Sequence, residues 1–144
     1  MIMTKEKKIY QHLTSSNICE IYKLLHNEGL VSFPPTASAI EKIDATIANI
    51  NGESFGVAHY ETVEKKIVAH LYFIIKNHAF TDGNKRTAIL VFLVLCSMNK
   101  LHEKRNTQYN LDELAVFLEQ QKNTDHHILI EVIANAIFKN GTLE

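Results

Sequence analysis

The chain has 144 residues, of which 46% are hydrophobic and 22% are charged, and its formal net charge is −1. These values are typical of one ordinary globular domain, and we expect residues 1–144 to form it, with 1–16 as a candidate N-terminal extension. The low net charge gives no support for direct nucleic-acid binding. The longest apolar run, Ala88 to Met98, is too short to cross a bilayer, and the N-terminus lacks the apolar segment of a secretion signal. We therefore expect no membrane association and a cytoplasmic location.

The N-terminal part of the chain predicts two helices. Residues 5–13 are expected to form a short, charged first helix. Asn17 and Glu20 have the spacing of an N-cap and its partner, so they predict the start of a second helix, which Gly29 ends. The apolar residues at helical spacing are expected to form its inner face: Ile18, Ile21, Tyr22, Leu24 and Leu25.

The next segment cannot be helical, because Pro34 and Pro35 exclude a helix and bias Phe33 towards extended backbone angles. We expect a short extended flap near 31–36. Thr36 or Ser38 then caps a helix that reaches about residue 50. Its buried stripe is predicted to be Ile40, Ile43, Ile47 and Ile50. Residues 53–59 are predicted to be a loop.

Two strong helices flank the most polar and chemically active part of the chain. The first, 61–77, has an inner face predicted from its spacing: Val63, Ile67, Leu71, Ile74 and Ile75. The second covers about 84–98 and carries no polar side chain from Ala88 to Leu95, which is typical of a helix that others surround. Between them, Gly83 and Asn84 indicate a tight turn. The start of the second helix directs unpaired N–H groups at this turn, which predicts an anion site.

The C-terminal part predicts a brief strand near 107–109 and two further helices. Asn110 and Glu113 have the N-cap spacing and open a helix that reaches about Gln121. The last helix is expected over 125–139, with Ile128, Val132, Ile133 and Ile137 facing inward. The sum is an all-α bundle of six or seven helices around a central apolar helix at about 84–98, with the short flap near 31–36.

The stretch from His78 to Arg86, HAFTDGNKR, resembles the signature of Fic/Doc proteins, H-x-F-x-D/E-G/A-N-G/K-R, at all seven constrained positions. The surrounding pattern of helices agrees with this family, and the resemblance covers about residues 17–139. It implies a single Fic/Doc domain with a Fic/Doc-type helical bundle. It also implies an enzyme that modifies a target protein with Mg²⁺ and ATP or another nucleoside triphosphate as co-substrate.

Two positions favour the Doc-like (death-on-curing) branch of the family. Proteins that transfer AMP usually have Gly where this chain has Lys85, and a second Arg where it has Ile89. The Doc-like branch contains toxin-type kinases that move a nucleotide phosphate to a Ser or Thr hydroxyl. Gly83 is the more Fic-like choice, so transfer of AMP stays open as an alternative. A second alternative is a catalytically inactive module that binds a nucleotide or a partner.

The resemblance implies a role for each residue of the motif. His78 is the general base that takes the proton of the target hydroxyl, a task suited to histidine because it changes charge near neutral pH. Phe80 is a structural anchor, and Asp82 is the candidate Mg²⁺ ligand. The phosphate-binding residues are Gly83, Asn84, Lys85 and Arg86, of which Lys85 and Arg86 also act in catalysis by neutralising charge on the phosphate oxygens.

The same family implies two protein partners. The flap lies where Fic/Doc proteins dock the target by strand addition, although two prolines lack the N–H for such pairing, and a plain connecting loop is the other interpretation. Many Fic proteins inhibit themselves through a helix with the pattern S/T-x-x-x-E-G/N. Here Glu28-Gly29 has Leu24 at the Ser/Thr position, so the resemblance implies control by a separate antitoxin protein. The target is expected to be a protein of the translation machinery.

Overall fold

The computed structural model describes residues 9–102 and 110–138 of the chain. Within these ranges it contains six helices and one small hairpin, in the order α1 (Ser15–Asn27), α2 (Ala37–Asn51), β1 (Glu53–Ser54), β2 (Val57–Ala58), α3 (Val63–Asn77), α4 (Asn84–Met98), α5 (Leu111–Gln120) and α6 (His126–Ile137). The predicted all-α bundle is therefore confirmed. None of the helices in the described ranges is long and apolar enough to cross a membrane.

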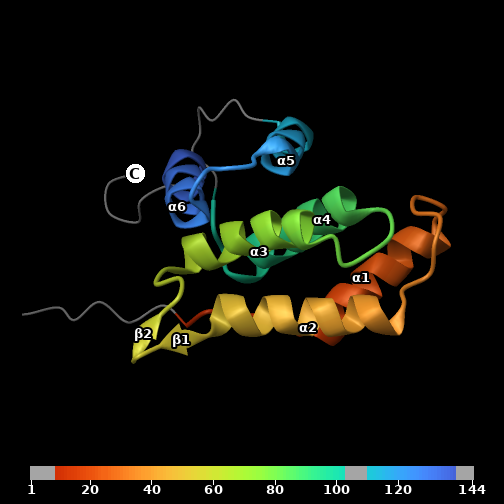
Figure 1. Ribbon diagram of the computed structural model, residues 1–144, viewed down its shortest axis with the longest axis horizontal. Helices are drawn as coiled ribbons and strands as arrows, with labels where there is room; N and C mark the ends of the chain where they lie inside the picture. Colours follow the sequence, from red (N-terminus) through yellow and green to blue (C-terminus); the bar gives the residue numbers. More distant parts are fainter. Residues whose placement is uncertain (1–8, 103–109, 139–144) are drawn as a thin grey trace, which may run out of the picture.

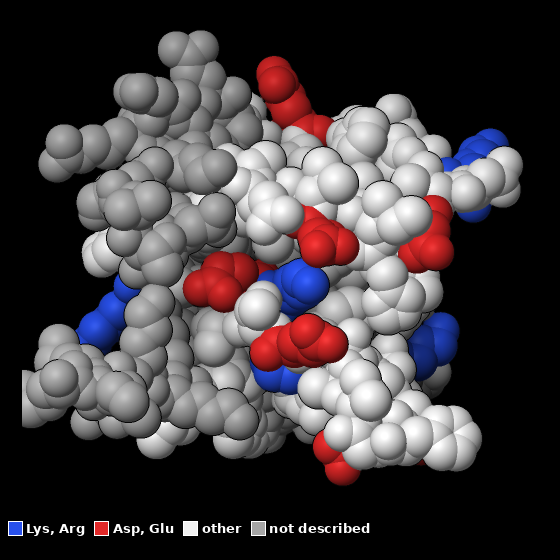
Figure 2. Space-filling model, turned by 90° about the vertical axis from the view of Figure 1, so that its left-hand side faces the viewer, with Lys and Arg blue, Asp and Glu red and all other residues white. Residues whose placement is uncertain are grey.

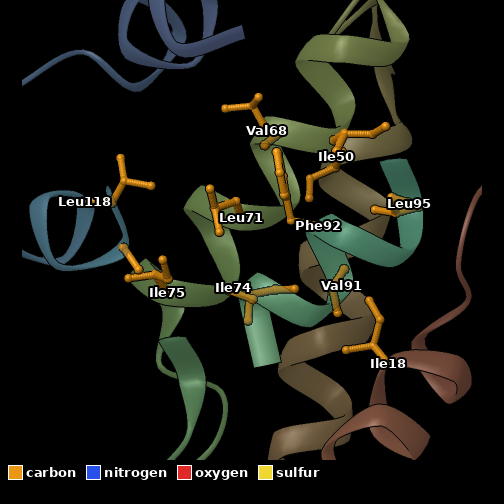
Figure 3. Close-up of a cluster of buried hydrophobic side chains, with 14 of the residues drawn as sticks. Ile18, Ile50, Val68, Leu71, Ile74, Ile75, Val91, Phe92, Leu95 and Leu118 are labelled. Carbon is orange, nitrogen blue, oxygen red and sulfur yellow. The ribbon is translucent and has the colours of Figure 1, made fainter. Parts of the chain in front are cut away.

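Helix α3 lies at the centre of the bundle and packs against α2, α4, α5 and α6. Figure 1 shows α2 along one side of α3, with α5 and α6 on the opposite side. The inner face predicted for α3 is confirmed, because all five of its residues are buried: Val63, Ile67, Leu71, Ile74 and Ile75. In Figure 3, the side chains of Leu71 and Ile74 share one core with Val91 and Phe92 of α4. The carboxyl end of α3, where His78 follows, is therefore anchored by the largest part of the core.

Helix α4 begins and ends where the sequence predicted, but it is not covered on all sides. Leu93 and Met98 are 42% and 38% exposed. Only α1, α3 and α5 pack extensively on α4, so one strip of this apolar helix faces outward. The expectation that other helices cover α4 on every side is therefore not met at Leu93 and Met98, and α3 packs against more helices than α4 does.

The predicted first helix at 5–13 is also wrong in the part that the structure describes. Residues 9–13 are not helical, and residues 5–8 lie outside the described ranges. The backbone of Gln11 is bonded to the Asn99 side chain in both directions, with its N–H 2.7 Å from Asn99 Oδ1 and its carbonyl oxygen 2.9 Å from Asn99 Nδ2. This pairing with the end of α4 replaces the bonds of a helical turn.

The N-cap of helix α1 lies three residues before the predicted cap, Asn17. Thr14 is the N-cap, and Asn17 is its partner in a capping box, in which each side chain accepts from the other residue's backbone N–H. Two other predicted caps are correct, because Thr36 caps α2 and Asn110 caps α5. Asp125, predicted as the first residue of the last helix, is the N-cap of α6. The last helix begins with His126, directly after its cap.

Several residues predicted to face inward are exposed instead. Leu24, Ile40, Ile128 and Val132 are between 41% and 60% exposed. In α6 the buried positions include Leu129 and Ile130, so the true inner face is rotated from the predicted one. Helical spacing defines a stripe only to within about one position when apolar residues are this frequent, and the neighbouring helices decide which side is covered.

The segment 53–59, predicted to be a loop, contains the antiparallel hairpin of β1 and β2. Phe55 and Gly56 form its tip with φ angles of 54° and 80°, which is the turn geometry that two-residue hairpins need. Figure 2 shows the face of the molecule at this end, where acidic and basic side chains alternate. The predicted strand near 107–109 lies outside the described residues. The last helix was predicted to reach Lys139, but α6 ends at Ile137, because Phe138 has an extended backbone.

Candidate functional site

The motif residues lie in the loop between α3 and α4 and in the first turn of α4. In Figure 1 this loop is at the opposite end of the bundle from the hairpin, on the side of the segment that joins α1 to α2. Residues from two distant parts of the chain, 22–33 and 78–86, therefore meet at one end of the molecule. All the site residues predicted from the motif lie in this loop or in the first turn of α4.

His78 ends α3 in a left-handed backbone conformation, with φ 45° and ψ 50°. A non-glycine residue rarely adopts this conformation, which is a form of local strain that is concentrated at functional sites. The side chain is exposed and forms no hydrogen bond with any described residue. The backbone of His78 is therefore fixed at the end of α3, while its imidazole is exposed to solvent.

Phe80 fixes the middle of the loop to the core. It is only 3% exposed, and its ring stacks on that of Tyr22 in α1, with ring centroids 3.9 Å apart and planes 7° from parallel. Burial, with a smaller effect of the nearby Asp82 charge, raises the pKa of the Tyr22 phenol. Its hydroxyl thus stays protonated and donates to the carbonyl oxygen of Phe33 at 2.6 Å.

Asn84 clamps the loop with its side-chain amide. Asn84 Oδ1 accepts from the Phe80 N–H at 3.1 Å, and Asn84 Nδ2 donates to the Phe80 carbonyl at 2.8 Å. The residue is 8% exposed. Both polar ends of the amide are therefore occupied by the loop itself. The part of Asn84 left to meet a phosphate is its backbone N–H, at the first position of α4.

Gly83 precedes α4 in a left-handed conformation, with φ 79°, and supplies no side-chain cap. A side chain at this position would overlap that of Val31, which is 4% exposed. Glycine is thus required twice, once for its backbone angle and once for the close approach of Val31. The first N–H groups of α4 receive no side-chain cap, as a phosphate-binding helix start requires.

Asp82 accepts two backbone N–H groups, that of Gly83 on Oδ1 at 2.8 Å and that of Ser32 on Oδ2 at 3.3 Å. Within the described residues, no group of three His, Cys, Asp or Glu side chains could hold a metal ion. A lone, exposed carboxylate does not form a complete metal site. It fits Mg²⁺, which keeps several waters and is bound in nucleotide sites by one or two carboxylates and phosphate oxygens.

The two cations of the motif contact other protein groups. Lys85 Nζ lies 3.1 Å from Oε1 and 3.0 Å from Oε2 of Glu119 in α5. Arg86 Nη1 donates to the carbonyl oxygen of Leu30 at 2.6 Å. Lys76, just before the loop, donates to the backbone carbonyls of Glu119 and Gln121 at the end of α5. Both sides of the loop are thus connected to α5.

Sequence reasoning missed the contribution of four residues to this site. Tyr22 was predicted to lie on the inner face of its helix, but its stacking on Phe80 has no local signal. The contacts of Leu30 and Ser32 with the motif join residues 50 or more positions apart. Glu119 had no distinguishing context in the sequence. Only a motif or an alignment that includes these positions could have identified them.

The chain matches the model of the Fic/DOC family over residues 7–96. The match contains α1 to α3, the whole motif and most of α4, whereas α5 and α6 lie beyond it, so it ends earlier than the expected limit near residue 139. Comparison with curated proteins and with solved structures gave no match. Members of this family are in general transferases that modify proteins. With well over half of its residues matched and the motif assembled in one loop, the chain belongs to the Fic/DOC family.

Proposed function

We propose that this chain is a Doc-like protein kinase, which moves the terminal phosphate of ATP or another nucleoside triphosphate to a Ser or Thr hydroxyl of a target protein. The observation that carries the proposal is the set of cations in the first two turns of α4. Lys85 and Arg86 are adjacent, and Ile89, where AMP-transferring relatives have a second Arg, packs against the core. The start of α4 thus offers two cations and no third one a turn later, which supports transfer of a single phosphoryl group.

In the proposed reaction, the hydroxyl oxygen of the target attacks the γ-phosphorus. The bond between that phosphorus and the β,γ-bridging oxygen breaks, and the nucleoside diphosphate leaves. His78 takes the hydroxyl proton, which its exposed imidazole can reach. Lys85 and Arg86 neutralise the charge that develops on the transferring and bridging oxygens. Gly83 and the backbone N–H of Asn84 bind phosphate at the start of α4.

Asp82 is the residue that would hold Mg²⁺, which when bound supplies charge neutralisation at the phosphate oxygens. Its two oxygens are exposed at the rim of the loop, and their present partners are backbone N–H groups rather than a cationic side chain. Such partners can be exchanged for a metal ion at low cost. The chemistry of a single carboxylate thus fits a metal that arrives with the nucleotide.

Transfer of AMP is the second candidate. Here the hydroxyl would attack the α-phosphorus and expel pyrophosphate. Pyrophosphate carries more negative charge than the nucleoside diphosphate that a kinase releases. Gly83 favours this alternative, because Doc-like motifs often carry Ala at this position. The side chain of Ile89 opposes it, since a half-buried isoleucine cannot replace the missing cation. A catalytically inactive binding module remains the third candidate, and the exposed His78 opposes it.

The proposed partners are a target in the translation machinery and a separate antitoxin, both in the cytoplasm. Exposed apolar side chains of α1, the flap and α2 suit a protein contact: Leu24, Leu30, Phe33 and Ile40 are between 41% and 57% exposed. Docking by strand addition is less well supported, because the backbone groups of Leu30, Ser32 and Phe33 are bonded inward. Control by an antitoxin fits the lack of an Arg at position 89 with which Glu28 could pair.

The test uses purified protein, Mg²⁺ and a bacterial lysate in two parallel incubations, one with ATP labelled on the γ-phosphate and one with ATP labelled on the α-phosphate. We expect a protein band labelled only from the γ-position, absent with His78→Ala. A band labelled from the α-position assigns AMP transfer instead. Label that persists in His78→Ala, or no label with any of the four nucleoside triphosphates, contradicts an enzyme that works through this motif.

A further inference from the structure

Residues 30–33, which join α1 to α2, lie directly on the motif loop, and their backbone bonds to two of its charged side chains. The carbonyl of Leu30 accepts from Arg86 at 2.6 Å, and the N–H of Ser32 donates to Asp82 at 3.3 Å. Between these two contacts, Val31 is buried against Gly83. We call residues 30–33 the covering segment.

Each backbone group of the covering segment carries a partial charge of the same sign as the ligand that the proposed function places on the same side chain. A carbonyl oxygen carries partial negative charge and contacts Arg86, which the proposed function assigns to a phosphate oxygen. An N–H group carries partial positive charge and contacts Asp82, which the proposed function assigns to a metal ion. The segment therefore satisfies both side chains when no nucleotide is bound, but only with the partial charges of the backbone.

A fully charged phosphate or metal ion can displace these backbone groups from Arg86 and Asp82. A phosphate oxygen forms a charge-assisted, bidentate pair with an arginine, which is stronger than a single bond to a neutral carbonyl. Releasing the segment costs little buried surface besides Val31, because Leu30 and Phe33 are already 49% and 50% exposed. A nucleotide that binds Asp82 and Arg86 more tightly than the segment does would shift the chain towards an open motif.

One further contact holds the covering segment from its other end. The hydroxyl of Tyr22 donates to the carbonyl of Phe33 at 2.6 Å, while the Tyr22 ring is stacked on Phe80. The ring belongs to the support of the loop, whereas among the described residues the hydroxyl bonds only to the segment. Removing that oxygen alone should loosen the segment without disturbing the stacking.

We infer that the covering segment is an internal competitor of Mg²⁺–nucleotide for Asp82 and Arg86, and that the Tyr22 hydroxyl sets its strength. Tyr22 is then a positioning residue that limits nucleotide affinity, although it touches neither the nucleotide nor the target. The inference rests on the proposed function, because it assumes that a nucleotide binds at the motif. It adds a way in which the chain restrains that binding without any partner.

The test compares the whole wild-type chain with Tyr22→Phe, which keeps the ring and removes the hydroxyl. Tyr72→Phe is the matched control, since it removes a phenol hydroxyl from α3, where the ring packs on Phe73 and His126. Calorimetry measures the Kd of Mg²⁺–ATP, and amide hydrogen exchange of residues 30–33 is followed without and with that ligand. Val31→Ala provides a second way to loosen the segment, should Tyr22→Phe fold poorly.

We expect Tyr22→Phe to bind Mg²⁺–ATP about two- to tenfold more tightly than wild type, the range that one net hydrogen bond supplies. Exchange at residues 30–33 should be faster in this variant without ligand, and in wild type it should rise when Mg²⁺–ATP is added. Val31→Ala should change both quantities in the same direction, and Tyr72→Phe should change neither.

Unchanged or weaker binding by Tyr22→Phe, in a wild type that does bind Mg²⁺–ATP, overturns the competition and leaves the proposed function intact. Protection of residues 30–33 that increases with Mg²⁺–ATP does the same, because the segment would then be part of the nucleotide site. No binding by any variant contradicts the proposed function itself, and the inference is overturned with it. The binding of the wild type thus separates the two failures.

Discussion

The amide of Asn84 offers the sharpest test of how the motif loop is held. Both of its polar ends are bonded to the backbone of Phe80, four residues earlier, in a place that is 8% exposed. The replacement Asn84→Ala removes both bonds at once. It also leaves a backbone N–H and a carbonyl without partners in a poorly hydrated position. The change is therefore expected to act on stability before it acts on phosphate binding.

The size of the effect follows from these two bonds. Each net hydrogen bond contributes about 1 kcal/mol, and an unsatisfied buried group costs about 1–3 kcal/mol. We expect Asn84→Ala to lower the free energy of unfolding by roughly 2–5 kcal/mol, which for a chain of this size lowers Tm by roughly 6–15 °C. Asn84→Asp keeps the acceptor for the Phe80 N–H but places a carboxylate oxygen against the Phe80 carbonyl oxygen, so it should also lower the free energy of unfolding.

The assay is urea unfolding at pH 7 followed by circular dichroism, with thermal unfolding as a second measurement. Binding of Mg²⁺–ATP is then measured at a temperature where both variants are folded. If Asn84→Ala lowers stability by less than about 0.5 kcal/mol, the clamp does not hold the loop. In that case a large loss of nucleotide affinity would assign the amide to the phosphate instead.

Two further predictions concern single residues. His70 is fully buried, and its ring nitrogen Nδ1 lies 2.7 Å from a backbone carbonyl, which fixes Nδ1 as the donor; burial lowers its pKa to about 4. Because the unfolded chain binds this proton more readily, the free energy of unfolding should fall as the pH drops below about 6.5, by about 2–3 kcal/mol near pH 4.5. Urea unfolding across this range should show a shallower pH dependence in His70→Gln, and an unchanged slope would refute the assignment. Gly83→Ala should destabilise the chain by more than Gly29→Ala in the same assay. Both glycines have positive φ, near 79° and 75°, but only at Gly83 does a side chain collide with Val31, and equal losses would contradict that close approach.

Much of the fold could be predicted because its signals are local. The caps at Thr36, Asn110 and Asp125 act on N–H groups two or three residues away, so each can be recognised in a short stretch of sequence. The buried face of α3 and the limits of α4 were also predicted, from a dense apolar pattern and a glycine turn. The family motif lies in one continuous stretch, so its residues needed no tertiary structure to be found together.

Other features depend on contacts between distant parts of the chain. Ile40 and Val132 had the spacing of buried residues, yet no neighbouring helix covers them. Residues 9–13 are not helical as predicted, because the backbone of Gln11 bonds to the side chain of Asn99, almost 90 positions away. Propensity and spacing contain no information on such partners, because packing against other elements can outweigh them.

The sequence by itself thus determined the type of fold, the position of most helices, and the residues of the motif. The tertiary structure alone decided the state in which those residues are held. It placed the covering segment on Asp82 and Arg86, Glu119 beside Lys85, and the Asn84 amide on the loop backbone. The first three contacts join residues 34 to 56 positions apart, and the last depends on the path of the loop. Such contacts arise only when helices pack, since packing brings side chains together irrespective of their separation in the chain.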